Sequence, residues 1–184
     1  HSDGCILRPT YRKKGNEDHI AFSMHHKDTA VLYKIKRILG TSGRVREYPH
    51  YKSPHSQLHA YDRMDIIDQY GDIKSAPPDV TGHERHFIRG VVDGDGCLYN
   101  RPNRSSFSIQ FMTQSLDVGY FIVNHLADKL SMIPKKPIDK DNSHVWCWEG
   151  KIARLISWYL YHGNIGLCVL DRKRDYYREH LLNN

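Results

Sequence analysis

Apolar and polar positions alternate in several short stretches of the chain and follow a helical spacing in others. In the first half the alternation predicts four strands of a half-solvated sheet, over residues 5–11, 20–26, 44–48 and 57–61. Between the second and third strands, apolar residues follow one helical face from Val31 to Leu39, with Asp28 as the cap and Gly40 as the end. A further helix is predicted over residues 64–70.

The second half repeats this order of elements after an additional helix over residues 84–95. Its strands are predicted over residues 96–99, 107–113 and 144–148. Its later helices are predicted over residues 118–130, 152–161 and 169–182. The sequence therefore predicts an α+β fold of duplicated αββαββα halves, in which the first copy begins without its first helix.

Short sequence matches support the duplication. The tripeptide Asp-Gly-Cys at residues 3–5 returns at 95–97, Met24 aligns with Met112, and Leu58 aligns with Val145, so the offset shortens from 92 to 87 positions. A segment with Pro77-Pro78 separates the copies, because proline ends helices and fixes extended chain. We therefore expect two domains, residues 1–80 and 81–184.

Charge and cysteine usage narrow the class of protein. The net charge is +6, each half carries +3, and the pI is about 9.1, which suits a polyanionic partner without requiring one. None of the four cysteines forms a C-x-x-C pair, so reduced thiols are expected rather than a zinc knuckle or disulfide scaffold. No stretch approaches the ~18 apolar residues of a membrane span, and no signal peptide is recognisable. We expect an intracellular protein of the cytoplasm, nucleoid or an organelle, neither secreted nor membrane-bound.

The predicted helix over residues 84–95 carries the candidate chemistry. Ile88, Val91 and Val92 share a face with Gly90, whose bare backbone lets two helices approach closely. Asp95 ends the helix, where a carboxylate is unfavourable against the helix dipole and calls for a cation such as a divalent metal. On this stretch alone, a solvated Asp in an Asp-Gly turn is the alternative.

Residues 88–96, Ile-Arg-Gly-Val-Val-Asp-Gly-Asp-Gly, closely resemble the nine-residue signature of the LAGLIDADG homing endonucleases. Residues 3–5 resemble the end of a first copy, and the repeat order extends the resemblance over essentially the whole chain. The resemblance implies two halves related by approximate two-fold symmetry, whose sheets form a saddle over DNA and whose signature helices pair. It implies a site-specific DNA endonuclease that makes a staggered double-strand break across the minor groove.

The resemblance also implies a metal site. Asp3 and Asp95 match the metal-binding acids of the two halves, which we expect to lie close together, with Ser2 and Gly94 beside them. The cofactor is expected to be Mg²⁺, with Ca²⁺ or Mn²⁺ as substitutes. Carboxylate-bound metals activate water and stabilise the leaving oxygen at a phosphodiester.

Four further catalytic positions follow from the resemblance. Gln114 matches a polar residue that positions water, and His26 takes that place in the first half, although both could instead cap the following helices. A basic residue near the transition state is matched by Lys74, which could also be a surface charge, and by either Lys173 or Arg172 in the second half.

The expected partner is double-stranded DNA with a long, asymmetric site. Side chains at the four predicted hairpins suit contacts to bases and phosphates. They are Arg8, Arg12, Lys13, Lys14, Arg44, Arg46, Tyr48 and Lys52 in the first half, and Arg101, Asn103, Arg104, Lys135, Lys136 and Lys140 in the second.

Two other functions remain open at this point. The chain could be an RNA maturase that assists intron splicing, although the retention of Asp3 and Asp95 argues against this role. It could also be a non-catalytic or degenerate DNA-binding remnant, for example of an intein, which the missing first helix favours. We expect an upstream segment that supplies this helix and gives a monomer. Without it, the exposed apolar face of residues 84–95 should promote dimerisation.

Overall fold

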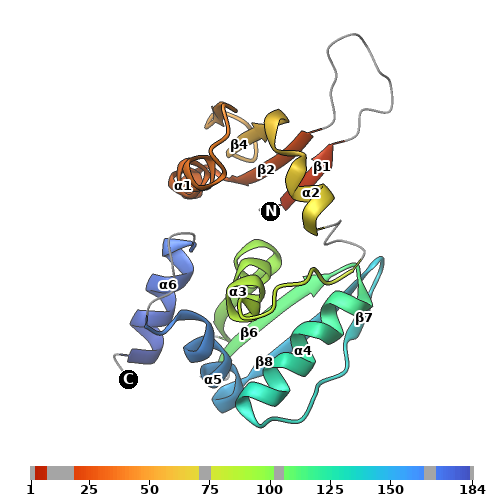
Figure 1. Ribbon diagram of the computed structural model, residues 1–184. Helices are drawn as coiled ribbons and strands as arrows, with labels where there is room; N and C mark the ends of the chain where they lie inside the picture. The colour runs from red at the N-terminus through yellow and green to blue at the C-terminus, as the bar shows by residue number, and fades with distance from the viewer. Residues whose placement is uncertain (1–2, 8–18, 71–75, 102–105, 164–168, 183–184) are drawn as a thin grey trace. The chain divides into compact units, whose positions relative to one another are not determined.

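The computed structural model (Figure 1) describes residues 3–7, 19–70, 76–101, 106–163 and 169–182. The chain divides into two compact units, His1–Gly71 and Asp72–Asn184, called unit 1 and unit 2 below. This boundary falls before the one expected after residue 80, and Pro77-Pro78 belongs to unit 2. Within the described ranges, no helix combines the length and the apolar character needed to cross a membrane.

Unit 1 contains a four-stranded antiparallel sheet with the strand order β1-β2-β4-β3. Its strands are β1 (Asp3–Leu7), β2 (His19–His25), β3 (Val45–Tyr48) and β4 (His55–Ala60). The principal helix is α1 (Thr29–Leu39), which ends at Gly40 with a left-handed φ of 62°. Short helices η1 (His26–Asp28), η2 (Tyr61–Arg63) and α2 (Asp65–Tyr70) complete the described part.

The core of unit 1 lies between α1 and one face of the sheet. Val31 and Leu32 of α1 are buried, as are Ile20 of β2 and Leu58 and Ala60 of β4. Because successive strand residues point to opposite faces, the intervening residues of β2 and β4 lie on the face away from α1. We call this surface the open face of unit 1.

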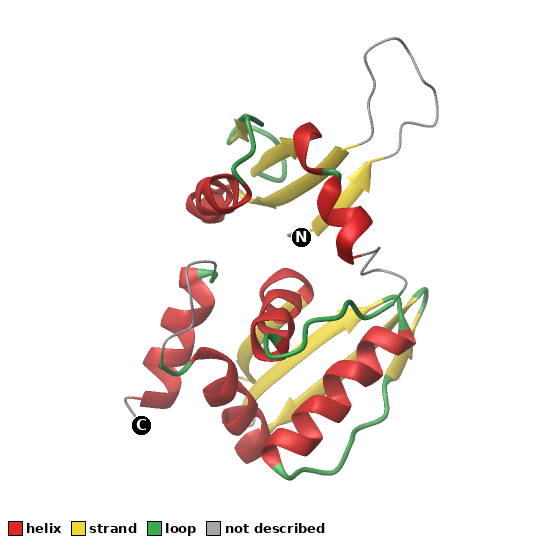
Figure 2. Ribbon diagram, viewed as in Figure 1, coloured by secondary structure: helices red, strands yellow, loops and turns green. Residues whose placement is uncertain are grey.

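Unit 2 has the same strand order, β5-β6-β8-β7. Its strands are β5 (Gly96–Arg101), β6 (Ser106–Thr113), β7 (Ile138–Lys140) and β8 (Ser143–Glu149). Its helices are α3 (Glu84–Asp95), α4 (Leu116–Leu130), α5 (Gly150–Tyr161) and α6 (Asp171–Tyr177), followed by a π-helical turn, Arg178–Leu182. Figure 2 shows α3 and α4 lying across one face of this sheet.

The core of unit 2 contains large aromatic side chains from the sheet. Phe107 and Phe111 of β6 and Trp146 and Trp148 of β8 are buried beneath the helices. Phe111 stacks on Trp146 with ring centroids 5.2 Å apart. A Cβ at Gly119 would stand 2.0 Å from the Trp146 ring, so this glycine lets α4 approach the sheet. The sheet face away from these helices is called the open face of unit 2.

The α+β fold and its duplication are confirmed, and the strand register shows which residues correspond. The residues lying opposite one another across three strands are Gly4, Phe22 and Leu58 in unit 1, and Gly96, Phe111 and Trp146 in unit 2. Phe22 therefore corresponds to Phe111, and Leu58 corresponds to Trp146.

This correspondence corrects the alignment made from the sequence by one residue. Placing Met24 on Met112 put Phe22 on Gln110, and the third match put Leu58 on Val145. A shift of one residue moves a strand's side chains to the opposite face. The sequence alignment therefore paired helix-facing residues with residues of the open face. Matching the buried aromatic and aliphatic positions restores the register.

Candidate metal and nucleic-acid site

The end of α3 presents Asp95 to solvent. Asp95 is exposed at the last position of the helix, and Gly96 begins β5 with extended backbone. The Gly96 N–H donates to the Val92 carbonyl. A Cβ at Gly96 would come within 2.4 Å of the Val92 oxygen, so only glycine lets the chain pass directly from this helix into the strand. The Asp-Gly pair therefore fixes where the carboxylate emerges.

A buried lysine neutralises the carbonyls at the same helix end. Lys173 is 4% exposed, and its Nζ donates to the backbone oxygens of Val92 at 2.5 Å, Asp93 at 2.8 Å and Gly96 at 2.7 Å. An ammonium has three N–H donors, so all three are engaged in these bonds. The end of α3 therefore has a cation from the protein itself. From the sequence, only a divalent metal was considered in this role. Arg172, the alternative to Lys173, is exposed.

Asp93 ties the same end of α3 to α5 and α6. Its carboxylate is 8% exposed and accepts hydrogen bonds from the Tyr161 hydroxyl at 2.7 Å and the Leu170 N–H at 3.1 Å. Burial raises the pKa of Asp93, while these two hydrogen bonds and the charge of Lys173 act in the opposite direction. Asp93 and Lys173 together hold the start of α6 against the end of α3. Sequence reasoning missed Asp93, although its place inside the signature was visible.

Gln114 lies at the same end of the sheet as Asp95. Gly96 pairs with Phe111, so Asp95 stands level with Met112, two residues before Gln114. Gln114 is exposed between β6 and α4. It does not cap α4, because the Ser115 hydroxyl accepts from the Val118 N–H at 3.3 Å. An acid and a neutral hydrogen-bonding side chain therefore emerge together here.

In unit 1 the register pairs Asp3 with Ser23, two residues before His25 at the end of β2. His25 thus corresponds to Gln114, and sequence reasoning missed it because its alignment was one residue out. His25 is exposed, and its Nδ1 accepts from the Lys27 N–H at 3.2 Å. The side chain of Asp3 lies outside the described structure, as do Ser2 and Lys74 entirely.

His26, the residue predicted for this role, has partners next to the helix-covered face. Its Nδ1 lies 3.4 Å from the hydroxyl of Ser56, which is fully buried, and 3.6 Å from Oε2 of Glu47. Its backbone N–H donates to Pro54 at 3.1 Å. These contacts fix the start of η1. The catalytic role of His26 stays a prediction.

Most of the described residues predicted to bind DNA are accessible. Arg44, Arg46 and Lys52 are exposed, and Tyr48 is half-buried and stacked on His55 with ring centroids 5.0 Å apart. In unit 2, Lys135, Lys136 and Lys140 are exposed, and the Lys135 ammonium donates to the Cys147 carbonyl. The side chain of Arg101 and all of Arg8, Arg12, Lys13, Lys14, Asn103 and Arg104 lie outside the described structure.

The oxygen donors at the end of α3 suit a magnesium ion. Within the described ranges, no group of three or more His, Cys, Asp and Glu residues forms a metal site. Mg²⁺ does not need such a cage, because it keeps several waters and binds through one or two carboxylates together with substrate phosphates. The exposed Asp95 carboxylate, with the adjacent Gly94 carbonyl as a further oxygen, fits this donor set.

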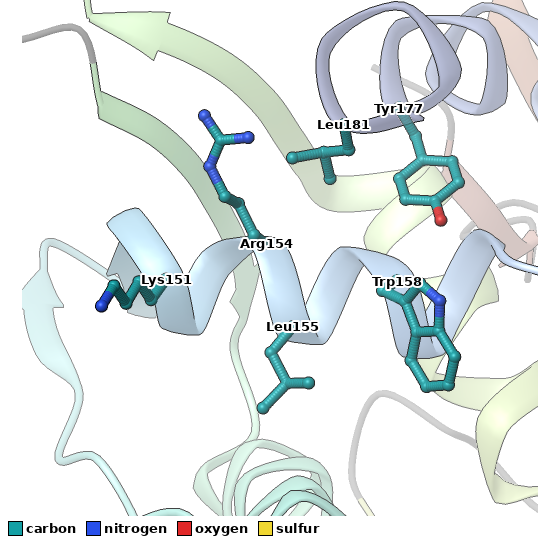
Figure 3. Close-up of a pocket in the computed structure, with 6 residues that line it drawn as sticks. All are labelled: Lys151, Arg154, Leu155, Trp158, Tyr177 and Leu181. Carbon is teal, nitrogen blue, oxygen red and sulfur yellow. The ribbon is translucent and has the colours of Figure 1, made fainter. Parts of the chain in front are cut away.

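A separate pocket of about 360 Å³ lies on α5 and the last helical segment (Figure 3). The side chains lining it are Lys151, Arg154, Leu155, Trp158, Tyr177 and Leu181. None of these residues belongs to the predicted catalytic or DNA-binding set. The pocket is therefore distinct from the end of α3.

No protein-family model and no curated protein matches the sequence. Solved structures do match it. The N-terminal LAGLIDADG domain of WhiA aligns with a TM-score of 0.57 at 15% identity, over 87% of this chain and 78% of that one. The LAGLIDADG homing endonuclease I-SmaMI bound to cleaved DNA aligns with a TM-score of 0.55 at 12% identity, over 94% and 81%. I-LtrWI bound to target DNA aligns with a TM-score of 0.51 at 11% identity, over 97% and 83%. The chain therefore has the LAGLIDADG fold that the signature at residues 88–96 indicated.

Proposed function

We propose that the chain is a magnesium-dependent, site-specific DNA endonuclease that makes a staggered double-strand break. The observation that carries this proposal is the arrangement at the end of α3. Asp95 is exposed and lies level with Met112 near the end of β6, two residues before Gln114. Asp93 and Lys173 brace the same helix end from within. Buried charges that support one exposed carboxylate are typical of a site that must hold its geometry.

Each residue then has a role that its chemistry allows. Asp95, and Asp3 in unit 1, hold Mg²⁺, which when bound lowers the pKa of water and neutralises charge on the leaving oxygen. Gln114 cannot act as a base, so it orients water through its amide. His25 accepts a hydrogen bond at Nδ1, and its neutral form therefore carries a proton at Nε2 and can orient water in unit 1.

Exposed basic residues in both units support DNA as the substrate. Arg44, Arg46 and Lys52 belong to unit 1, and Lys135, Lys136 and Lys140 belong to unit 2. Such side chains neutralise phosphates and release counterions. The structural relatives I-SmaMI and I-LtrWI were solved bound to DNA. A long and asymmetric site follows from two units that share topology but not surface residues.

A DNA-binding protein without nuclease activity is the second candidate. The observation that favours it is that the fold is not confined to structures described as endonucleases, because the LAGLIDADG domain of WhiA matches as well as the endonucleases do. The fold by itself does not separate these functions, because function resides in the site.

Substitution of Asp95 separates the two candidates. Incubation of the wild-type chain with a plasmid library in Mg²⁺, followed by sequencing of linear products, is expected to reveal one cleaved site. Asp95→Asn keeps the side-chain shape but removes the charge, so it should abolish double-strand cleavage or leave only nicking. Affinity for the site, measured in Ca²⁺, should persist or rise because one negative charge has gone.

The exposed residue Asp128 on α4 provides a matched control, because Asp128→Asn makes the same chemical change outside the site. Its cleavage activity should stay within about twofold of the wild type. Unimpaired cleavage by Asp95→Asn would overturn the proposed mechanism. Specific binding by a wild-type chain that never cleaves would establish the second candidate.

A further inference from the structure

The two open faces carry opposite chemistry at corresponding positions. In each sheet we consider the row of three open-face residues that lies level with the candidate acid. We call this set the acid row. In unit 1 it consists of Arg46, Gln57 and Ser23, and in unit 2 of Ile138, Val145 and Met112.

Strand pairing alone establishes that these rows correspond. Ser23 follows Phe22 as Met112 follows Phe111, and Ser23 pairs with Gln57 as Met112 pairs with Val145. The edge strands complete the rows, because Arg46 pairs with Gln57 and Ile138 pairs with Val145.

The acid row of unit 1 offers hydrogen-bond donors. His59 Nε2 lies 3.3 Å from the Gln57 amide oxygen, which can only accept, so His59 donates there. His59 Nδ1 then accepts from His19 Nε2 at 2.8 Å. With its oxygen engaged in this way, Gln57 retains two amide N–H donors. Neither these donors nor the exposed guanidinium of Arg46 has a hydrogen-bond partner among the described residues.

The acid row of unit 2 is entirely apolar and remains accessible. Ile138 is 59% exposed and Met112 is 38% exposed, and Val145 between them is half-buried. Three side chains side by side on adjacent strands form a contiguous apolar surface. The exposed residues Lys136 and Lys140 lie in the same segment as Ile138.

We infer that the two sheets recognise different bases: the acid row of unit 1 reads the acceptors of guanine, and the acid row of unit 2 reads the methyl group of thymine. This inference rests on the proposed binding of double-stranded DNA. Guanine presents two acceptors, N7 and O6, in the major groove, whereas only thymine presents a methyl group there. Donors and apolar side chains are the respective complements.

The surroundings of the apolar row favour DNA over a protein partner. Lysines beside Ile138 give the surface the charge needed for phosphates. The corresponding row in unit 1 is polar, so the position itself does not require apolar residues for folding. A protein partner for the apolar row would leave the accompanying lysines without a role.

Modified bases test the inference directly. Once a bound site has been selected from random duplexes with the full chain, thymines are replaced by uracil, which lacks the methyl group. Guanines are replaced by 7-deazaguanine, which lacks N7. Uracil should weaken binding about fourfold at the thymine that unit 2 reads. 7-Deazaguanine should weaken binding about tenfold at the guanine that unit 1 reads.

Two isosteric variants assign each effect to its row. Gln57→Met should remove the 7-deazaguanine effect and leave the uracil effect. Met112→Gln should do the reverse, because it replaces an exposed apolar side chain of the unit 2 row with a polar one of similar size. Thermal unfolding confirms that both variants are folded. Binding that is insensitive to both modified bases, or variants that do not separate the effects, would overturn the inference while leaving the proposed endonuclease intact. A chain that binds no duplex in any selection would overturn both.

Discussion

Unit 1 and unit 2 build the same sheet on cores of different composition. The described core of unit 1 is aliphatic and small, with Leu32, Leu58 and Ala60 as its fully buried apolar members. The core of unit 2 contains Trp146, Phe107 and Phe111 at less than 2% exposure. Burial of apolar area contributes about 25 cal/mol per Å², so among the described residues the large aromatic side chains of unit 2 each contribute more stabilisation than the aliphatic side chains of unit 1.

The comparison shows which side of a duplicated sheet is free to change. Residues facing the helices vary in size but are mainly apolar, because the alternation of apolar residues along a strand sets its register. Residues of the open face take no part in this requirement. One face can therefore become a network of histidines and donors in unit 1 and an apolar surface in unit 2, without any change in topology.

The largest effect on stability is expected where unit 2 buries a charge. Lys173→Met leaves three backbone carbonyls at the end of α3 without their donor and removes one of the two cations, Lys173 and Arg89, that act on the buried Asp93 carboxylate. Breaking a buried charge interaction of this kind costs about 4 kcal/mol. Urea denaturation, which yields the free energy of unfolding, measures this cost. The exposed Lys151 supplies the control, because Lys151→Met should change stability by less than about 0.5 kcal/mol. A cost below 1 kcal/mol for Lys173→Met would show that this end of α3 is held in another way.

A pair of glycine substitutions compares the packing of the two units. Gly119→Ala places a methyl group 2.0 Å from the Trp146 ring and should destabilise unit 2 by about 3 kcal/mol. Gly40→Ala in unit 1 meets no atom within 4 Å, and only its left-handed φ of 62° is unfavourable, so the cost should be about 1 kcal/mol. Denaturant unfolding of both variants gives the ratio of their losses in the free energy of unfolding. Equal costs would contradict the close contact between α4 and the Trp146 ring at Gly119.

The smallest effect concerns the pH dependence of unit 1. Burial lowers the pKa of His59 from 6.5, and the charges of His19 and Arg46 lower it further. Between the lowered pKa and 6.5 the unfolded chain binds more protons than the folded chain. The contribution of His59 to stability is therefore complete above about pH 6.5 and declines as the pH falls below that value.

His59→Gln tests this contribution, because a glutamine can still donate to Gln57 and accept from His19. The variant should lose less thermal stability than the wild type between pH 7.5 and pH 5.5. The pKa of His125 in unit 2 is also lowered. Because His125 is present in both proteins, its contribution to the pH dependence cancels when the two are compared. If the thermal stability of the variant and of the wild type declined equally as the pH falls, His59 would not contribute to the pH dependence of stability.

Much of the fold was predictable because it depends on local periodicity. The helix predicted over residues 84–95 is α3, with the same bounds, and the predicted strand over residues 107–113 is nearly all of β6. The predicted αββαββα order implied an edge strand beside residues 144–148, but no range was predicted for it. The reason is that the three exposed residues of β7 (Ile138–Lys140) carry no alternation of burial. Antiparallel pairing with β8 on one side, which is not visible in the local sequence, defines this strand.

The candidate site was predictable only in part. Asp95 and Gln114 follow from a motif and from a position after a strand, which are features of the linear chain. Recognition of His25 required the correct strand register. The contacts of Lys173 with Val92 join residues about 80 positions apart, and no local pattern indicates such a pair.

The sequence by itself determined the order of elements, the duplication and the acid at the end of α3, because each depends on side chains that are neighbours along the chain. Only the tertiary structure decided the one-residue register between the copies, the burial of Lys173 against the end of α3 and the contrast between the acid rows. These features depend on which strands and helices lie against each other, and hydrogen bonding across strands and packing in the core select that arrangement from among several that the local pattern allows.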